Sequence, residues 1–258
     1  MEEGFNPYTE NFTNVYNVFW NDFIEKYGPK IYDLFKKKAG SPINYYLDVG
    51  CGTGKLIELF NSKNINSWGI DNSKSMLKIA EERLKNEITA GKVKLIQQDA
   101  SDFHLDFKFD AITSTFDTIN HLDNLSDVEK CFRLVKTHLN ESGMFLFDVN
   151  TATTLRNWNF IEVEETDDKS IVYIMQGKYE NAWNKAYSRV SGFIKNQNNE
   201  FYSRFDEVYY NTIFKIEDIN DLLKQIGFSN IETYDEDFRL ITGDPEECER
   251  VFILAMIE

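Results

Sequence analysis

Glycine occupies three alternate positions, Gly50, Gly52 and Gly54, directly after a short apolar run and before a helix-like segment. Such a turn brings the backbone close to a ligand and exposes amide groups at a helix N-terminus. A phosphate-binding P-loop needs GxxxxGK followed by Ser or Thr, whereas the spacing here is GxxxGK and Leu56 follows. A dinucleotide-binding loop needs GxGxxG, and Lys55 stands where its third glycine should be. The loop therefore predicts a small-molecule site of neither kind.

Asp48 stands two residues before the first of these glycines. A carboxylate at that point would lie beside the polar end of a ligand, where it would repel a pyrophosphate. It would attract cationic groups such as the ammonium and sulfonium of S-adenosylmethionine. The alternative is that Asp48 only ends the strand or caps the turn. Cys51, inside the loop, is most simply a small filler without chemistry of its own.

The elements around this loop alternate between apolar runs and amphipathic segments. Helices are predicted at Lys55–Asn61, Ser73–Ala90 and Val128–Leu139. Buried strands are predicted between and beside them, at Ile43–Val49, Ser67–Ile70, Val93–Ile96, Phe109–Ser114 and Gly143–Val149. Strands that alternate with helices of this length indicate βαβ units and a parallel sheet.

The N-terminal part places large aromatic residues three or four positions apart between Phe12 and Tyr27, which predicts one face of a helix. Gly28-Pro29 is predicted to break this helix, and a shorter helix follows. The run of three lysines at residues 36–38 is predicted to be its solvated end, where cations favour the helix dipole. Residues 1–40 would thus form a helical lid.

The pattern changes after Asn150, where three extended segments rich in Tyr, Val, Ile and Phe follow one another. They span Ile171–Gly177, Lys185–Ile194 and Phe201–Tyr210, with turns at Glu180-Asn181 and at the asparagine-rich residues 196–199. A helix at Ile216–Ile226 and strands at Phe228–Tyr234 and Arg250–Ile257 complete the chain. We expect a core at residues 41–159, an antiparallel cap at 160–211, and the rest of the core at 212–258.

The segment DVGCGTG resembles the first motif of the class I S-adenosylmethionine-dependent methyltransferases, which commonly read (D/E)xGxGxG. The helix with Ser75-Met76-Leu77 and Ala80, and the "FD.I" strand at Phe109, are also similar to that family. The resemblance implies that Asp71, followed by Asn72, binds both ribose hydroxyls of the cofactor, and that Asp99, followed by Ala100, reaches the adenine amino group. It implies a cofactor loop made of Asp48, Gly50, Cys51, Gly52 and Gly54.

The segment from Thr115 to Leu122 follows the fourth strand, and ligands of open α/β sheets bind outside the carboxyl ends of strands. We therefore expect Thr115 to face the cofactor. His121 is either a general base or a half-exposed residue of a helix-starting loop. Asn150 has either a role in the pocket or a role in a turn. Tyr16 resembles the tyrosine that related enzymes fold over the cofactor, although its helix face would also suit the core.

The cap resembles that of small-molecule methyltransferases, including amino-sugar N-methyltransferases. Tyr209, in the last strand of the cap, is a candidate catalytic residue. Relatives often carry His at this position, so the sequence departs from their pattern there. A cap that serves only as an interface in a homodimer is the alternative.

The formal net charge of −15 argues against nucleic acid as a partner, because a phosphate backbone is bound through Lys and Arg. No apolar run approaches the ~20 residues of a membrane span. The three separated cysteines suggest no disulfide frame and fit the cytoplasm, and no cluster of residues suggests a metal site.

We thus expect an α/β, Rossmann-like fold: a seven-stranded, mostly parallel sheet with an N-terminal helical lid and an inserted antiparallel β cap. The resemblance implies transfer of a methyl group from S-adenosyl-L-methionine to an N or O atom of a small-molecule acceptor. Alternatives are a methyltransferase acting on RNA or protein, and a non-catalytic S-adenosylmethionine-binding protein. The sequence does not identify the acceptor, the accepting atom, the need for a base or the oligomeric state.

Overall fold

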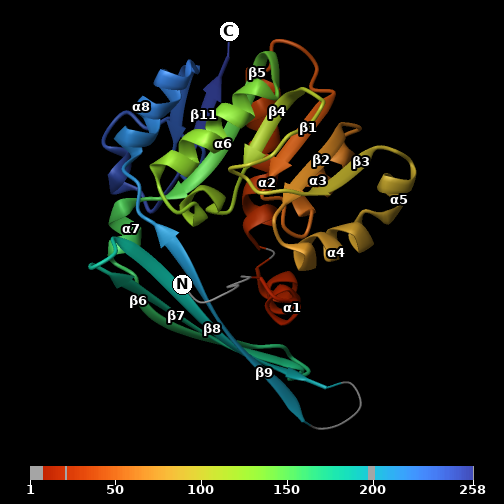
Figure 1. Cartoon of the computed structure of the whole chain (residues 1–258), viewed down its shortest axis with the longest axis vertical. Coiled ribbons are helices and arrows are strands. Elements are labelled where there is room, and N and C mark those ends of the chain that lie inside the picture. The colour runs from red at the N-terminus through yellow and green to blue at the C-terminus, as the bar shows by residue number, and fades with distance from the viewer. Residues whose placement is uncertain (1–7, 21, 197–200, 258) are drawn as a thin grey trace.

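The computed structural model describes residues 8–20, 22–196 and 201–257. Its larger sheet has seven strands in the order β10-β11-β5-β4-β1-β2-β3 (Figure 1). The five strands from β3 to β5 are parallel, and β11 and β10 are antiparallel to their neighbours. The strands are β1 (Tyr45–Val49), β2 (Asn66–Asp71), β3 (Val93–Gln97), β4 (Phe109–Ser114), β5 (Leu139–Asn150), β10 (Ser229–Tyr234) and β11 (Arg250–Met256). The predicted mostly parallel sheet is confirmed.

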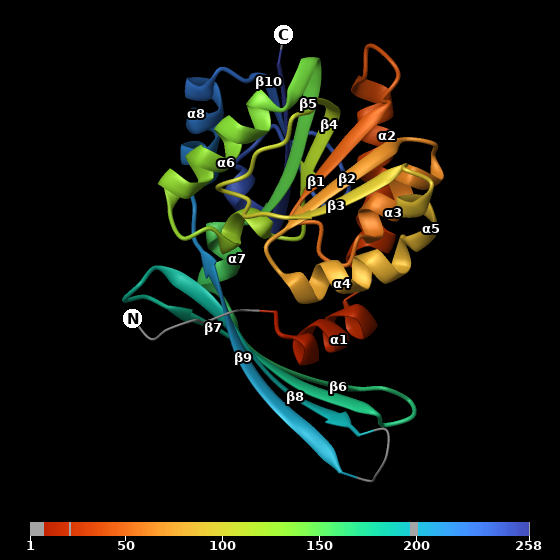
Figure 2. The same ribbon diagram turned by 45° about the vertical axis from the view of Figure 1, so that its right-hand side comes forward.

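Helices cover both faces of this sheet, because successive side chains of a buried strand point to opposite sides. Tyr46 of β1 joins a core cluster with α2 (Asp22–Lys38) and α3 (Lys55–Ser62). Leu47 joins a second cluster with α6 (Leu125–Thr137) and α8 (Ile216–Ile226). Figure 2 shows the two pairs of helices on opposite sides of the strands. None of the helices in the described ranges is long and apolar enough to span a bilayer.

The predicted helix break at Gly28-Pro29 is wrong. Helix α1 (Glu10–Phe19) ends before Trp20, and α2 then runs through Pro29 without interruption. Gly28 serves packing instead, since a Cβ there would lie 2.9 Å from Leu59 Cδ2 of α3. One buried face of α2 holds the helix together in spite of its proline. The three lysines do end α2, as predicted.

The predicted single helix from Ser73 to Ala90 is also wrong, because it divides into α4 (Lys74–Arg83) and α5 (Lys85–Thr89). Leu84 leaves helical dihedral angles between them and is buried. A Cβ at Gly54 would lie 2.9 Å from its Cδ1, so Leu84 packs directly under the glycine loop. Packing beneath the loop decides where the first helix ends.

A second, antiparallel sheet has the order β6-β7-β8-β9, one strand more than predicted. The additional strand is β6 (Asn159–Glu165), and the others are β7 (Ile171–Glu180), β8 (Lys185–Lys195) and β9 (Tyr202–Thr212). The predicted turn at residues 196–199 lies outside the described residues except for Asn196. We call this second sheet the cap sheet. Helix α1 lies between the two sheets, and its Phe12 and Val15 pack on the cap's inner face (Figures 1 and 2).

Candidate functional site

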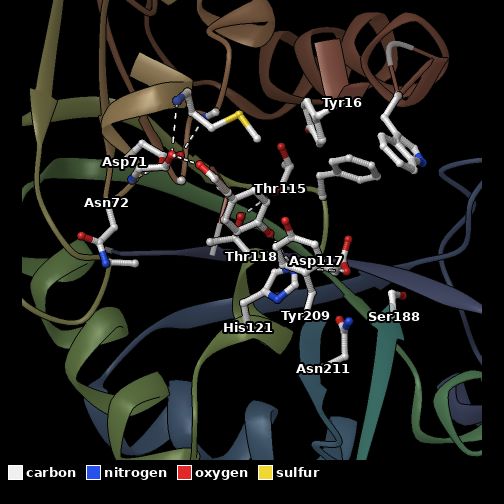
Figure 3. Close-up of a pocket in the computed structure, with 18 of the residues that line it drawn as sticks. Tyr16, Asp71, Asn72, Thr115, Asp117, Thr118, His121, Ser188, Tyr209 and Asn211 are labelled. Atoms are coloured by element: carbon white, nitrogen blue, oxygen red, sulfur yellow. Dashed lines mark hydrogen bonds and ion pairs between the residues drawn. The ribbon is translucent and has the colours of Figure 1, made fainter. Parts of the chain in front are cut away.

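A cavity of about 440 Å³ lies where the carboxyl ends of β1 to β4, the helix α1 and the inner face of the cap sheet meet. One end is lined by the glycine loop and the residues that follow β2 and β3. The other end is lined by the cap sheet and Trp158. Between them lie Tyr16, Thr115, Asp117 and His121 (Figure 3). Tyr8 also lines the cavity. The predicted site residues that reach the cavity are Tyr16, Gly50, Gly52, Asp71, Asn72, Asp99, Ala100, Thr115, His121 and Tyr209.

The glycine loop links β1 to α3 with positive φ at all three glycines, 76° at Gly50, 51° at Gly52 and 77° at Gly54. Other residues rarely adopt this region, which explains the alternate glycines. Gly50 and Gly52 line the cavity, and a Cβ on Gly52 would meet no atom within 4 Å. Gly54 and Cys51, in contrast, do not line it. Gly54 packs on α4, and Cys51 is buried against Gly69.

Asp71 ends β2 with its carboxylate held between two backbone amides. Gly52 N donates to Oδ2 and Ser73 N donates to Oδ1, each at 2.8 Å. Burial raises the pKa of Asp71, and the hydrogen bonds from the two amides oppose that rise. The side chain lines the cavity with further lone pairs available, as two neighbouring ribose hydroxyls would require.

Asp99 lies in the turn after β3 and is fixed in a similar way. Its Oδ1 accepts from Ser101 N at 2.8 Å and from Ser101 Oγ at 2.7 Å. Asn72 Nδ2 donates to its Oδ2 at 3.3 Å, so these two predicted cofactor contacts are joined directly. Ala100 beside them offers an apolar contact in the same part of the cavity.

Asp48 does not line the cavity, which differs from the contact expected from the sequence. Its side chain lies in the sheet, on the same face as Tyr46, and is buried. Thr113 Oγ1 donates to Asp48 Oδ1 at 2.7 Å, and the Tyr46 hydroxyl lies 2.5 Å from Thr113 Oγ1. Strand alternation thus turns the carboxylate toward Thr113 of β4 rather than into the cavity.

Burial raises the pKa of the Asp48 carboxyl to about 7. The nearby charge of Asp71 also raises this pKa, and the hydrogen bond from Thr113 lowers it. The unfolded chain ionises this group near pH 3.8, so stability falls as pH rises from about 4 to 7 and then levels off. The free energy of unfolding should fall by about 1.4 kcal/mol for each unit of the pKa shift. Asp48→Asn cannot ionise and should not show this decline. Urea unfolding of both proteins at pH 5 and pH 8 checks it. An equal difference between the proteins at both pH values would contradict the shift.

His121 ends the short helix η1 (Thr118–His121) at the centre of the cavity. Its Nδ1 lies 3.0 Å from the carbonyl oxygen of Tyr210, which can only accept, so Nδ1 carries a proton. Nε2 faces the cavity, 3.2 Å from the hydroxyl of Tyr8 and 3.7 Å from Asp117 Oδ2. In this tautomer Nε2 can only accept, so the Tyr8 hydroxyl donates to it, and a substrate proton would reach Nε2 in place of that hydroxyl.

The loop after β4 has positive φ at two non-glycine residues, 61° at Phe116 and 51° at Asp117. The buried carboxylate of Asp148 accepts from both backbone amides, at 2.6 Å from Phe116 N and 3.1 Å from Asp117 N. Arg250 of β11 pairs with Asp148, and its guanidinium lies 3.6 Å from Asp117 Oδ1. Burial alone would lower the pKa of Arg250, but the two carboxylates raise it, so it stays charged.

Arg250, Asp148 and Tyr8 were not predicted as site residues. A signal existed for the first two, because each is the one charged residue of an apolar strand segment, Arg250 in RVFILAM and Asp148 in GMFLFDV. A charge in such a segment requires a buried partner. Tyr8 had no such signal. Asn150 lines the cavity beside Arg250, its partner in the β5–β11 pairing.

Tyr209 lines the cavity from β9, but its hydroxyl donates to the carboxylate of Glu207. Burial and this carboxylate raise the pKa of Tyr209 far above its ordinary value. Glu207 also accepts from the backbone amide of Thr9, at 3.3 Å, and from its hydroxyl. The ring of Tyr209 contacts that of Tyr8, with the ring centres 4.8 Å apart and the planes tilted by 43°. The cap sheet thus binds the segment that leads into α1 and holds it over the cavity.

Tyr16 of α1 lines the cavity with its ring 5.7 Å from that of Phe116 and 6.0 Å from that of Trp20. It therefore belongs both to the aromatic packing of α1 and to the cavity wall.

In the described ranges no group of three or more His, Cys, Asp or Glu side chains is arranged to hold a metal ion.

A family model of a methyltransferase domain matches residues 47–143. YqeM of Bacillus subtilis (strain 168), itself provisionally named a methyltransferase, is 29% identical over 210 residues, 81% of this chain and 82% of that one. The crystal structure of an S-adenosylmethionine-dependent methyltransferase from Clostridium acetobutylicum ATCC 824 is also 29% identical. Its TM-score is 0.80, over 96% of this chain and 98% of that one.

The fold is also shared with KedS8, a sugar N-methyltransferase from Streptoalloteichus sp ATCC 53650. It is 18% identical with a TM-score of 0.82, over 100% of this chain and 97% of that one. The matched domain and the two relatives at 29% identity confirm the prediction of an S-adenosylmethionine-dependent methyltransferase.

Proposed function

We propose that this enzyme methylates the nitrogen of a small amine metabolite. The observation that carries the proposal is the single cavity, which joins Asp71 and the glycine loop at one end to the Nε2 atom of His121 and the cap sheet beyond it. Figure 3 shows Asp71 and Asn72 on one side of His121, and Ser188 and Asn211 on the other. A methyl donor and an acceptor could therefore meet near His121.

The residues at the first end fit S-adenosylmethionine. Asp71 would accept from the ribose hydroxyls, Asp99 would accept from the adenine amino group, and Gly52 leaves open space for close approach of the backbone. When bound, this cofactor supplies an electrophilic methyl group on a sulfonium. The chain's part is then to align the acceptor nitrogen, since alignment of two reactants supplies much of the rate of such a transfer.

The charges around the cavity support an amine as acceptor. Asp71, Asp99 and Asp117 line it, and the one guanidinium, that of Arg250, is already paired with Asp148 and Asp117. Such surroundings favour a cationic ligand over an anionic one. An ammonium must lose a proton before its nitrogen lone pair can attack, and Nε2 of His121 is placed to accept it. We assign Tyr209 a positioning role rather than a catalytic one, because its hydroxyl donates to Glu207.

KedS8 acts on a sugar nitrogen, which supports the same acceptor class here. RNA and protein are disfavoured by the charge of −15 and by the enclosing cap sheet. A homodimer stays a prediction, supported by Ile161 and Val163, which β6 exposes at 69% and 62%. The cytoplasmic location also stays a prediction.

His121→Ala should lower turnover of an amine acceptor at least tenfold, because a positioned general base contributes ~10²–10⁴-fold. Its dissociation constant for S-adenosylmethionine should stay within about threefold, less than ~0.7 kcal/mol, since Asp71 and the glycine loop are unchanged. Release of S-adenosylhomocysteine with an amine library, and calorimetry for the cofactor, measure the two quantities. Tyr209→Phe serves as the comparison, because Tyr209 also lines the cavity but has no proposed role in accepting a proton. Unchanged turnover in His121→Ala would remove the base from the proposal.

A further inference from the structure

Asn211 of β9 lines the cap end of the cavity and is 2% exposed. Its Oδ1 atom has no hydrogen-bond partner in the described part of the chain. A buried amide oxygen without a partner destabilises the folded chain, and most such oxygens in proteins are bonded. An orphaned polar atom on a side chain of the cavity wall points to a ligand that completes it when the amide turns toward the cavity.

Three neighbours of Asn211 have no side-chain donor left for its Oδ1 atom. Across the sheet Asn211 pairs with Ala186, which has no polar side chain. Tyr209, two residues before it on the same face, gives its hydroxyl to Glu207. The nearby amide of Asn120 donates to the carbonyl oxygens of Asn150, at 3.3 Å, and Thr212, at 3.1 Å. Rearrangement of these groups would break bonds that already hold the loop and strands in place.

The surroundings of Asn211 describe what would bind there. Ser188 lines the same end of the cavity, and Trp158 and Met175 add apolar surface. In Figure 3, Asn211 and Ser188 lie beyond His121 and Asp117 as seen from Asp71. A molecule with its reacting nitrogen at His121 would therefore extend its other end toward Asn211.

We infer that Asn211 selects the acceptor by accepting a hydrogen bond from a hydroxyl or N–H group separate from the methylated nitrogen. This inference rests on the proposed function. The acceptor it describes is a small amine with an apolar body and a second polar group, such as an amino alcohol. A site built to bond a polar group rejects analogues that lack it, because its own buried group is then left unpaired.

The test compares cyclohexylamine with 2-, 3- and 4-aminocyclohexanol, which add one hydroxyl at increasing distance from the nitrogen. Binding to the complex of the protein with S-adenosylhomocysteine is measured by calorimetry, and turnover by S-adenosylhomocysteine release. We expect at least one aminocyclohexanol to bind tenfold or more tightly than cyclohexylamine. Asn211→Leu should abolish this preference while raising Tm by a few degrees, since it removes the orphaned oxygen.

Asn220→Leu is the matched control. Asn220 lies on α8, away from the cavity lining, and its Oδ1 also lacks a partner among the described residues. This variant should also raise Tm but keep the preference for the hydroxyl. The inference is overturned if the wild type shows no such preference, including no binding of any of the four amines, or if Asn211→Leu retains it. Hydroxyl-dependent binding without turnover would support the role of Asn211 and contradict amine methylation.

Discussion

Asp71→Ala is expected to weaken S-adenosylmethionine binding by about 100-fold or more. Hydrogen bonds to an ionised carboxylate contribute ~1.5–3 kcal/mol each, so loss of two bonds to the ribose removes at least about 3 kcal/mol. The variant also frees the amides of Gly52 and Ser73, which Asp71 holds at 2.8 Å. The glycine loop and the start of α4 then lose their common anchor, which adds to the loss of affinity. Calorimetry with S-adenosylmethionine measures the effect.

Two further variants separate ribose binding from general damage. Asp71→Asn keeps one accepting oxygen and should lose less affinity than Asp71→Ala. Asp106→Ala removes a carboxylate that is 99% exposed outside the cavity, and should bind the cofactor normally. If Asp71→Ala binds as tightly as the wild type with its fold intact, Asp71 is not the ribose ligand.

Arg250→Met is expected to lower the free energy of unfolding by about 3–5 kcal/mol, because it leaves the buried carboxylate of Asp148 without its cation. Asp148 is fully buried and the Arg250 side chain is only 14% exposed, so water cannot replace the lost charge. Asp148 is also the acceptor for the amides of Phe116 and Asp117, whose positive φ angles need support from their surroundings. Turnover should fall too, since this loop leads into His121.

Urea unfolding monitored by circular dichroism measures this loss. Arg239→Met provides the comparison, since the Arg239 side chain is 75% exposed and its ion pair with Asp237 lies at the surface. Exposed pairs contribute ~0–1 kcal/mol, so this variant should unfold nearly as the wild type does. Similar small losses in both variants would show that Asp148 is relieved in another way, for example by taking up a proton.

The sheet could be predicted from the sequence because its central strands are buried on both faces and read as short apolar runs between helices. Strand β6 was missed for the opposite reason. It lies at the edge of the cap sheet, and its residues alternate between exposed and half-buried positions, with three glutamates among them. An edge strand that buries so little leaves no apolar pattern to read.

The cofactor end of the cavity was predicted more fully than the rest, because a short segment supplies each part of it. Gly50, Gly52, Asp71 and Asp99 each lie at the end of a strand or within three residues after it, so their order in the chain already implies a common edge. Asp48 was misplaced because strand alternation, not sequence distance, decides which way its side chain points. Arg250 and Asp148 are 102 residues apart, and only the antiparallel pairing of β11 with β5 brings them together.

The cap sheet leaves the larger sheet after β5 and returns after β9 at neighbouring points, since one amide, that of Asn120, bonds the carbonyl oxygens of both Asn150 and Thr212. A segment whose two ends lie together can be replaced without stretching the structure that carries it. Evolution could therefore exchange the cap sheet as a unit. Such an exchange would change the contacts to the acceptor and leave the cofactor end of the cavity unaltered. A chimaera made by swapping residues between these two points with those of a relative would inherit the relative's choice of acceptor.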